Sequence, residues 1–246
     1  MDILSILGLL FAAAAVVGGW IYSGGSIGAL FDFSALLIVV GGTFAAAMIQ
    51  SHISVFAYSL KMLLWAIFPP RLAAQQIIGK IVKWSNIARK EGLLGLENIA
   101  ETEQDNFVKK GLQLLVDGNE PESIKRVMEV EINAKIQFHR SAANIIESMG
   151  RYSLVIGFLA AVVETVQLTG NFTNPEVLSR GIESVLVALM YGFCLSQFIF
   201  VPFSKKLNYL VFTQDQIHNM LMEGVLSIAQ GENPRNIETK LQGFLQ

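Results

Sequence analysis

The sequence predicts an all-α membrane protein with four transmembrane helices in two hairpins, a cytoplasmic helical domain and a cytoplasmic C-terminal tail. The first observation is composition, because apolar residues make up 52% and charged residues only 15% of the 246 residues. Soluble domains usually carry about 25% charged residues. The second is the gathering of the apolar residues into long stretches, and the third is the lack of any stretch with the alternation of a strand. The membrane class is therefore the first hypothesis.

Four stretches have the length and composition of membrane spans. A helix needs about 20 mostly apolar residues to cross a bilayer, since each residue adds about 1.5 Å. Lys and Arg are absent from all four, and Glu164 is their one internal charge. The first lacks the basic start of a secretory signal and is interpreted as a retained span. The stretches are Ile3 to Tyr22, Phe33 to Gln50, Tyr152 to Leu168 and Ser184 to Val201.

The distribution of basic residues predicts the orientation. Thirteen Lys and Arg residues lie from Lys61 to Arg151, four follow Pro202, and only Arg180 lies in a short connecting loop. Basic residues are retained on the cytoplasmic side, so both termini and the long central segment are predicted to be cytoplasmic. The outward loops would be residues 23–32 and 169–183.

The segment between the second and third spans is predicted to be helical. Ser51 to Ile67 is apolar but carries Lys61 and Trp65, a mixture typical of an amphipathic helix along the inner membrane surface. Apolar residues at helical spacing continue after Pro69 and predict a small helical bundle. A turn at Gly231 to Asn236 should precede a last short helix. The predicted divisions are residues 1–50 (first hairpin), 51–151 (interfacial helix and cytoplasmic domain), 152–203 (second, pore-facing hairpin) and 204–246 (C-terminal tail).

Four stretches carry a resemblance to a known family. They are Ala88 to Glu97 (ARKEGLLGLE), Lys110 to Glu122 (KGLQLLVDGNEPE), Gly170 to Leu178 (GNFTNPEVL) and Glu223 to Leu241 (EGVLSIAQGENPRNIETKL). In this order and spacing, the chain resembles the MotA/PomA family of flagellar stator A subunits. The resemblance covers almost the whole chain.

The resemblance implies a subunit of a bacterial inner-membrane motor. Its expected partners are further copies of the chain in a ring of five, a B-type stator subunit with one span and a peptidoglycan-binding domain, and the rotor switch protein. It implies transport of H+ or Na+ and no cofactor. The histidines are too scattered, without cysteines or paired carboxylates at ligand spacing, to suggest a metal site. Lys205 and Lys206 could meet anionic membrane lipids. The net charge of -2 excludes a broad basic surface for nucleic acid, and no enzymatic motif is present.

The family motif places the rotor contact at Arg89 and Glu97, with Lys90 as an assisting charge. If one helix carried both, their eight-residue separation would place them about 12 Å apart. They would then reach a partner as two separate charges. The alternative reading is an ordinary solvated helix face.

The resemblance also assigns an ion-path or coupling group: Leu154, Ala161, Glu164, Leu189 and Pro202. Leu154 stands where the family has a hinge proline, Leu189 where most members have a pore-facing threonine, and Glu164 where a glycine is usual. A carboxyl group in hydrocarbon is costly, so Glu164 is either functional or a group that reaches the membrane interface. Pro202 matches a family proline, and its alternative reading is a helix stop.

Three other functions remain open at this point. An energy transducer of the ExbB/TolQ type usually has three spans, so the additional N-terminal hairpin argues against it. A non-conducting stator paralogue would fit the departures at Leu154 and Leu189. An unrelated channel or carrier would need polar residues at broken midplane helices, and only Glu164 is charged within a span. The ion itself, H+ or Na+, is not specified by these residues.

Overall fold

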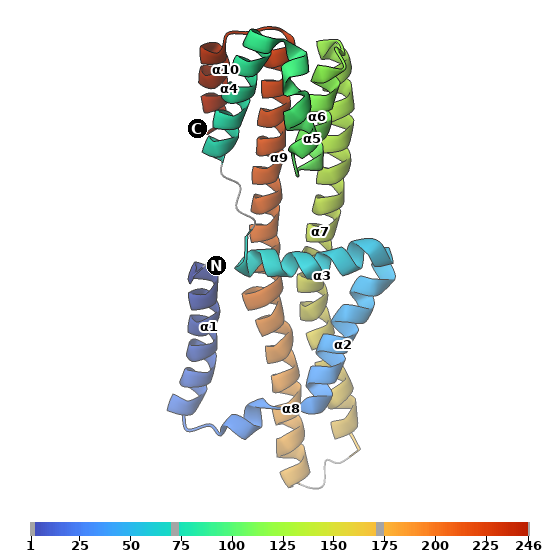
Figure 1. The fold of residues 1–246 in the computed structure, drawn as a ribbon. Helices are drawn as coiled ribbons and strands as arrows, with labels where there is room; N and C mark the ends of the chain where they lie inside the picture. The colour runs from blue at the N-terminus through green and yellow to red at the C-terminus, as the bar shows by residue number, and fades with distance from the viewer. Residues whose placement is uncertain (1–2, 70–73, 171–174, 246) are drawn as a thin grey trace. The chain divides into compact units, whose positions relative to one another are not determined.

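A computed structural model of the chain describes residues 3–69, 74–170 and 175–245, and all regular structure within these ranges is helical (Figure 1). The chain divides into two compact units. Unit 1 comprises residues 1–70 and 140–209, and unit 2 comprises residues 71–139 and 210–246. Two long helices, α7 (Pro121–Leu168) and α9 (Val201–Ala229), contribute residues to both units. The prediction of an all-α fold is confirmed.

Unit 1 contains the helices that can cross a membrane. Its elements are α1 (Ile3–Tyr22), η1 (Ile27–Leu30), α2 (Phe33–Gln50), α3 (Ile53–Ile67), the second part of α7, α8 (Pro175–Cys194), η3 (Leu195–Phe200) and the start of α9. The described residues include four helical stretches long and apolar enough to span a bilayer, in α1, in η1 with α2, in α7, and in α8 with its continuation. The prediction of four spans is confirmed, and α3 forms where the interfacial helix was expected.

The helices of the second hairpin are longer than the sequence suggested. Span three is the end of a helix that already begins at Pro121, and α8 begins at Pro175 rather than at Ser184. The predicted outward loop, residues 169–183, was therefore too long. Polar residues such as Arg180 made these turns look like a loop, but a helix can extend beyond an apolar core without breaking. Part of the GNFTNPEVL motif, residues 171–174, lies outside the described residues.

Pro202 does not end the helix. The backbone widens into a π-helix at η3, where the N–H of Val201 donates to the carbonyl of Ser196, and α9 then continues to Ala229. Proline has no N–H to donate and its ring clashes with the preceding turn of a regular α-helix, so a locally wider turn relieves the conflict. The helix-stop reading of Pro202 is wrong.

Small residues bring α7 and α8 together in unit 1. A Cβ atom placed on Gly157 would lie 2.8 Å from the Cα atom of Gly192. Such a short separation is possible only because both positions lack a side chain, as is common at contacts between membrane helices. Beside this crossing lies a small core of Ala35, Val39, Ala160, Ala161 and Ala188.

Unit 2 is the small helical bundle that the sequence predicted. It contains α4 (Ala74–Glu91), η2 (Leu93–Leu96), α5 (Glu97–Thr102), α6 (Asn106–Val116), the first part of α7, the end of α9, α10 (Pro234–Gln242) and η4 (Gly243–Leu245). Fully buried apolar side chains from nearly all of these elements form one core: Ile81, Leu96, Leu112, Leu115, Ile124, Met128, Met220 and Ile237. Burial of these side chains is the main driving force for the bundle.

The predicted last helix forms as α10. Asn233 caps its N-terminus by accepting a hydrogen bond from the N–H of Arg235, and Pro234 occupies its first turn. Lys240 of α10 forms an ion pair with Glu223 of α9 and lies 3.5 Å from a carboxylate oxygen of Glu232. The hydrogen bond with Glu223 raises the pKa of Lys240. These contacts hold the C-terminal helix on the bundle.

Candidate functional site

The first candidate site is the charged segment at the junction of α4 and α5 in unit 2. Helix α4 ends at Glu91, because Gly92 adopts a φ of +78°, which side-chain-bearing residues rarely adopt. The tight turn η2 follows, and α5 starts at Glu97. Arg89 and Glu97 therefore lie on different helices. The prediction of one helix with a 12 Å separation is wrong. The sequence did contain a helix-end signal, because Gly92 follows shortly after the basic residues Arg89 and Lys90.

The turn η2 packs directly against the end of α4. A Cβ atom on Gly95 would lie 2.8 Å from the Cβ atom of Glu91 and 3.2 Å from a methyl carbon of Ile87. Leu96, at the end of the turn, is fully buried in the core of unit 2. This packing brings the start of α5 beside the last turn of α4, so the basic and acidic residues of the motif lie at adjoining helix ends.

The electrostatics of these helix ends suit their charges. Arg89 and Lys90 lie in the last turn of α4, and Glu97 lies in the first turn of α5. Cations at a helix C-terminus and anions at an N-terminus are each stabilised by about 0.3–1 kcal/mol. All three side chains are exposed, and none has an ion-pair partner among the described residues. Both signs of charge are thus available to a partner.

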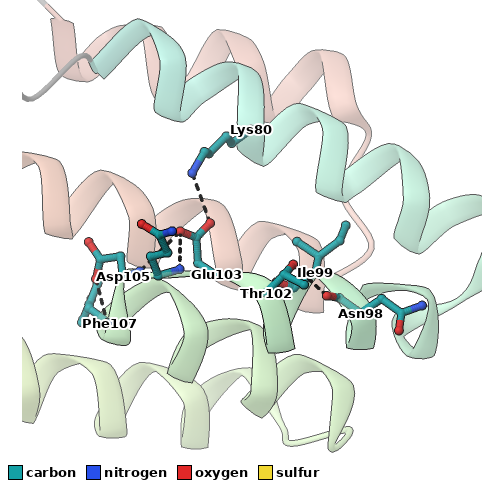
Figure 2. A network of polar contacts seen from close by, with 8 residues as sticks. Lys80, Asn98, Ile99, Thr102, Glu103, Asp105 and Phe107 are labelled. Atoms are coloured by element: carbon teal, nitrogen blue, oxygen red, sulfur yellow. Dashed lines mark hydrogen bonds and ion pairs between the residues drawn. The ribbon is translucent and has the colours of Figure 1, made fainter.

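A polar network holds the far end of α5 in place (Figure 2). The Nζ atom of Lys80, on α4, lies 3.1 Å from an oxygen of Glu103, which follows the last turn of α5. The other oxygen of Glu103 accepts a hydrogen bond from the N–H of Asp105, and Asp105 in turn caps α6 by accepting from the N–H of Phe107. Helix α5 is therefore anchored by Leu96 at one end and by this network at the other, which positions Glu97.

The second candidate site surrounds Glu164 in unit 1. Glu164 is only 7% exposed, and its carboxyl group is hydrogen-bonded to the hydroxyl of Ser34 at 2.8 Å. The same hydroxyl lies 2.7 Å from a carboxylate oxygen of Asp32, which also accepts a hydrogen bond from the hydroxyl of Ser184. The cluster thus connects α7 through α2 to α8. The side chain of Glu164 is enclosed by these spans instead of extending outward from them.

The hydroxyl of Ser34 joins the two carboxyl groups of this cluster. The Ser34 hydroxyl has one hydrogen and lies against two carboxyl groups, so it can donate to only one of them. Asp32 also accepts hydrogen bonds from the backbone N–H groups of Ser34 and Ala35 at the start of α2, an arrangement typical of a helix N-cap. One serine hydroxyl thus lies between the two carboxyl groups within this cluster.

Sequence reasoning missed four members of this cluster. Asp32 and Ser34 could have been recognised as the N-cap signature of span two, since an Asp precedes the apolar run. Ser184 carried no distinctive signal. The fourth is Tyr191, whose hydroxyl donates to the carbonyl of Leu30 at 2.8 Å and accepts from the N–H of Asp32 at 3.1 Å.

The other proposed ion-path residues separate into two groups. Ala161 is buried one turn before Glu164, and Leu189 of α8 packs against the same small core. Leu154 is half-buried and lies outside this core, while Pro202 is exposed next to the π-helix. The structure therefore brings Ala161, Glu164 and Leu189 together, and leaves Leu154 and Pro202 apart from them.

These features define a class: a multi-pass helical membrane protein with a polar cluster buried among its spans and a helical bundle that presents unpaired charges. Two family profiles match the chain. The MotA/TolQ/ExbB proton channel family matches residues 99–222, and the motility protein A N-terminal family matches residues 6–92.

Individual relatives agree with these matches. The chain is 31% identical to motility protein A of Bacillus subtilis (strain 168), over 100% of this chain and 91% of that protein. Its fold matches the structure of C. jejuni MotAB with a TM-score of 0.94 and 27% identity, over 100% of this chain and 96% of that one. The flagellar MotAB stator complex from Bacillus subtilis gives a TM-score of 0.88 and 30% identity, over 98% and 95%.

The chain belongs to the MotA/PomA family. It is a flagellar stator subunit and a multi-pass inner-membrane protein. The resemblance inferred from the four sequence motifs is confirmed. The family consists of stator and ion-channel subunits rather than enzymes.

Proposed function

We propose that this subunit, together with a B-type partner, couples the flow of H+ or Na+ across the membrane to torque on the flagellar rotor. The observation that carries the proposal is the carboxyl group of Glu164, buried in a span and hydrogen-bonded through Ser34 to Asp32. Buried ionisable groups in membrane spans commonly mark ion pathways. The similarity to MotAB complexes supports a B-type partner, which would have one span and a peptidoglycan-binding domain.

Residues 152–203 form the ion-conducting hairpin in this proposal. Glu164 supplies the polar group of the path, with Ala161 and Leu189 as its apolar neighbours. Leu154 stands where the family has a hinge proline. In this proposal the bending required for coupling therefore occurs at Pro202 and at the π-helix before it. A π-helix inside a span has fewer regular backbone hydrogen bonds than an α-helix, which suits a segment that must change shape.

The apolar outer face of α7 supports assembly into a ring. Its exposed side chains in unit 1 recur at helical spacing, at Val155, Phe158, Leu159, Val162, Val163 and Val166. Such a stripe in a membrane span is covered by lipid or by another helix. We infer that the B-type partner and neighbouring copies cover it in a ring of five subunits. Residues 1–50 would form the outer hairpin, beside membrane lipid.

Unit 2 would act on the rotor from the cytoplasm. Residues 51–151 and 204–246 are then cytoplasmic, as are both termini, in agreement with the distribution of basic residues. Arg89, Lys90 and Glu97 would contact charges of opposite sign on the rotor switch protein. Exposed ion pairs contribute only about 0–1 kcal/mol, which suits a contact that must form and break at each step.

Complementation of motility tests the proposed coupling. The chain and its candidate B-type partner should restore swimming to a strain that lacks its own stators. Swimming should then stop when the gradient of the transported ion, H+ or Na+, is collapsed. The measurement is swimming speed with each ionophore. Membrane insertion without swimming under any condition would instead favour a non-conducting paralogue or an envelope energy transducer.

Replacement of the buried carboxyl group tests the ion path. In Glu164→Gln the amide keeps the shape and a hydrogen bond to Ser34 but cannot exchange a proton. We expect ion flux and torque to fall on the order of tenfold, which corresponds to a barrier higher by about 1.4 kcal/mol. Glu183→Gln, a half-buried carboxyl change on α8, is the matched control. Equal ion flux in the two variants would show that Glu164 is not part of the ion path.

A further inference from the structure

Leu94 is an exposed apolar residue inside the charged segment of unit 2. Its side chain is 70% exposed, and only Val130, at 71%, is comparable among the large apolar residues described in this unit. The neighbouring leucines behave differently, because Leu93 packs against the core and Leu96 is fully buried. A large apolar side chain held in water by a rigid turn is a common feature of binding surfaces.

The geometry of η2 explains why Leu94 points outward. In a 3-10 helix, residues three apart lie on the same side. Leu93 and Leu96 therefore share the inner side of the turn, whereas Leu94 shares the other side with Glu97. The last turn of α4, with its basic residues, packs against the same turn through Gly95. Leu94 thus lies between a basic helix end and an acidic helix start.

We propose that Leu94 is the apolar anchor of the contact with the rotor switch protein. The partner surface that fits has an acidic group facing Arg89 and Lys90, a basic group facing Glu97 and an apolar side chain or pocket between them. This inference rests on the proposed function of the charged segment. Glu97, beside Leu94, makes the alternative of an anionic membrane surface unfavourable, because like charges would meet there.

Charged and apolar side chains contribute differently to an interface. Charges at the rim of an interface steer the partner and set its orientation, and they contribute less to how tightly it is held. A few side chains that are excluded from water when the partner docks carry most of the binding energy of an interface. Removal of an apolar side chain from water is itself favourable. Leu94 is the one large, strongly exposed apolar side chain described between the charges of this segment. It is therefore the residue that can supply this part of the contact.

A matched pair of substitutions tests the anchor. Leu94→Ser should weaken binding of the full-length stator complex, in lipid nanodiscs, to purified rotor switch protein by about tenfold. Val130→Ser removes a similar apolar side chain at equal exposure elsewhere in unit 2 and should bind normally. Leu94→Met keeps an apolar side chain and should retain most of the affinity. Stall torque, measured at equal amounts of each variant in the membrane, should decrease in the same order, from Val130→Ser through Leu94→Met to Leu94→Ser.

The outcomes separate this inference from the proposed function. If Leu94→Ser binds normally, or if Leu94→Ser and Val130→Ser lose the same affinity for the rotor switch protein, then Leu94 is not the anchor of the contact. If charge reversal at Arg89 and Glu97 abolishes binding while Leu94→Ser does not, the rotor contact stands and only the anchor fails. If neither change affects binding, the assignment of this segment to the rotor fails as well, and the anchor fails with it.

Discussion

The variant Gly192→Ala should lose a large part of the stability of unit 1. A Cβ atom at this position would lie 2.7 Å from the carbonyl oxygen of Ser153 and 2.8 Å from the Cα atom of Gly157. Both are backbone atoms of α7, so no side chain can rotate away and the two helices must separate. Overpacking of this kind costs about 1–3 kcal/mol. The measurement is the midpoint of thermal unfolding of the solubilised protein, together with its amount in the membrane.

Two glycines provide the comparison. A Cβ atom on Gly41, inside α2, would meet no atom within 4 Å, so Gly41→Ala should leave stability unchanged or slightly raise it through better helix propensity. At Gly181 the nearest atoms all belong to the side chain of Leu168, which can move, so an intermediate effect is expected. If Gly192→Ala and Gly41→Ala unfold at the same temperature, the close crossing does not determine the stability of this hairpin.

Reversal of the two charges proposed to contact the rotor should abolish most torque while leaving the protein folded. In the double variant Arg89→Glu and Glu97→Lys, the proposed attractive pairs with the rotor would become repulsive, and the net charge is unchanged. Both side chains are exposed and have no described ion-pair partner, so the bundle loses no internal ion pair. The helix ends lose only about 0.3–1 kcal/mol each from unfavourable dipole interactions. Swimming speed at equal membrane levels measures the effect.

Another charge reversal in unit 2 is the control. Lys125 and Glu129 lie 3.9 Å apart on exposed turns of α7, so the double variant Lys125→Glu and Glu129→Lys keeps both the net charge and an internal pair. It should swim normally. Restoration of torque by reversed charges on the rotor switch protein would identify the contact directly. Loss of the Arg89 and Glu97 double variant from the membrane would instead make these residues structural.

The general architecture could be predicted because it depends on local composition. Long apolar stretches with few charges predict spans wherever they occur, and the helices at Ile3–Tyr22 and Phe33–Gln50 end where the apolar runs end. The last helix could be predicted from Asn233 and Pro234, since a cap followed by proline is a local signal. The family resemblance also depends on short motifs, each readable without knowledge of the fold.

Helix extents were less predictable because the end of an apolar run is not the end of a helix. The apolar stretch of span three begins near Tyr152, but its helix begins at Pro121, because polar and apolar residues extend the same backbone hydrogen-bonding pattern. The opposite error occurred at Gly92, where helical spacing appeared to continue but a positive φ ended the helix. This break decides the geometry of Arg89 and Glu97, which sequence separation alone placed on one helix.

The sequence by itself determined the class of the protein, its family, the number of spans and the positions of the ionisable residues in the spans and in the Ala88–Glu97 motif. Only the tertiary structure decided what surrounds those residues. Ser34 and Glu164 are 130 positions apart, and Asp32 and Ser184 are 152 apart, yet they form one hydrogen-bonded cluster. Contacts at such separations depend on how whole helices pack, as at Gly157 and Gly192. Local patterns describe each helix, but only the packed helices define a site.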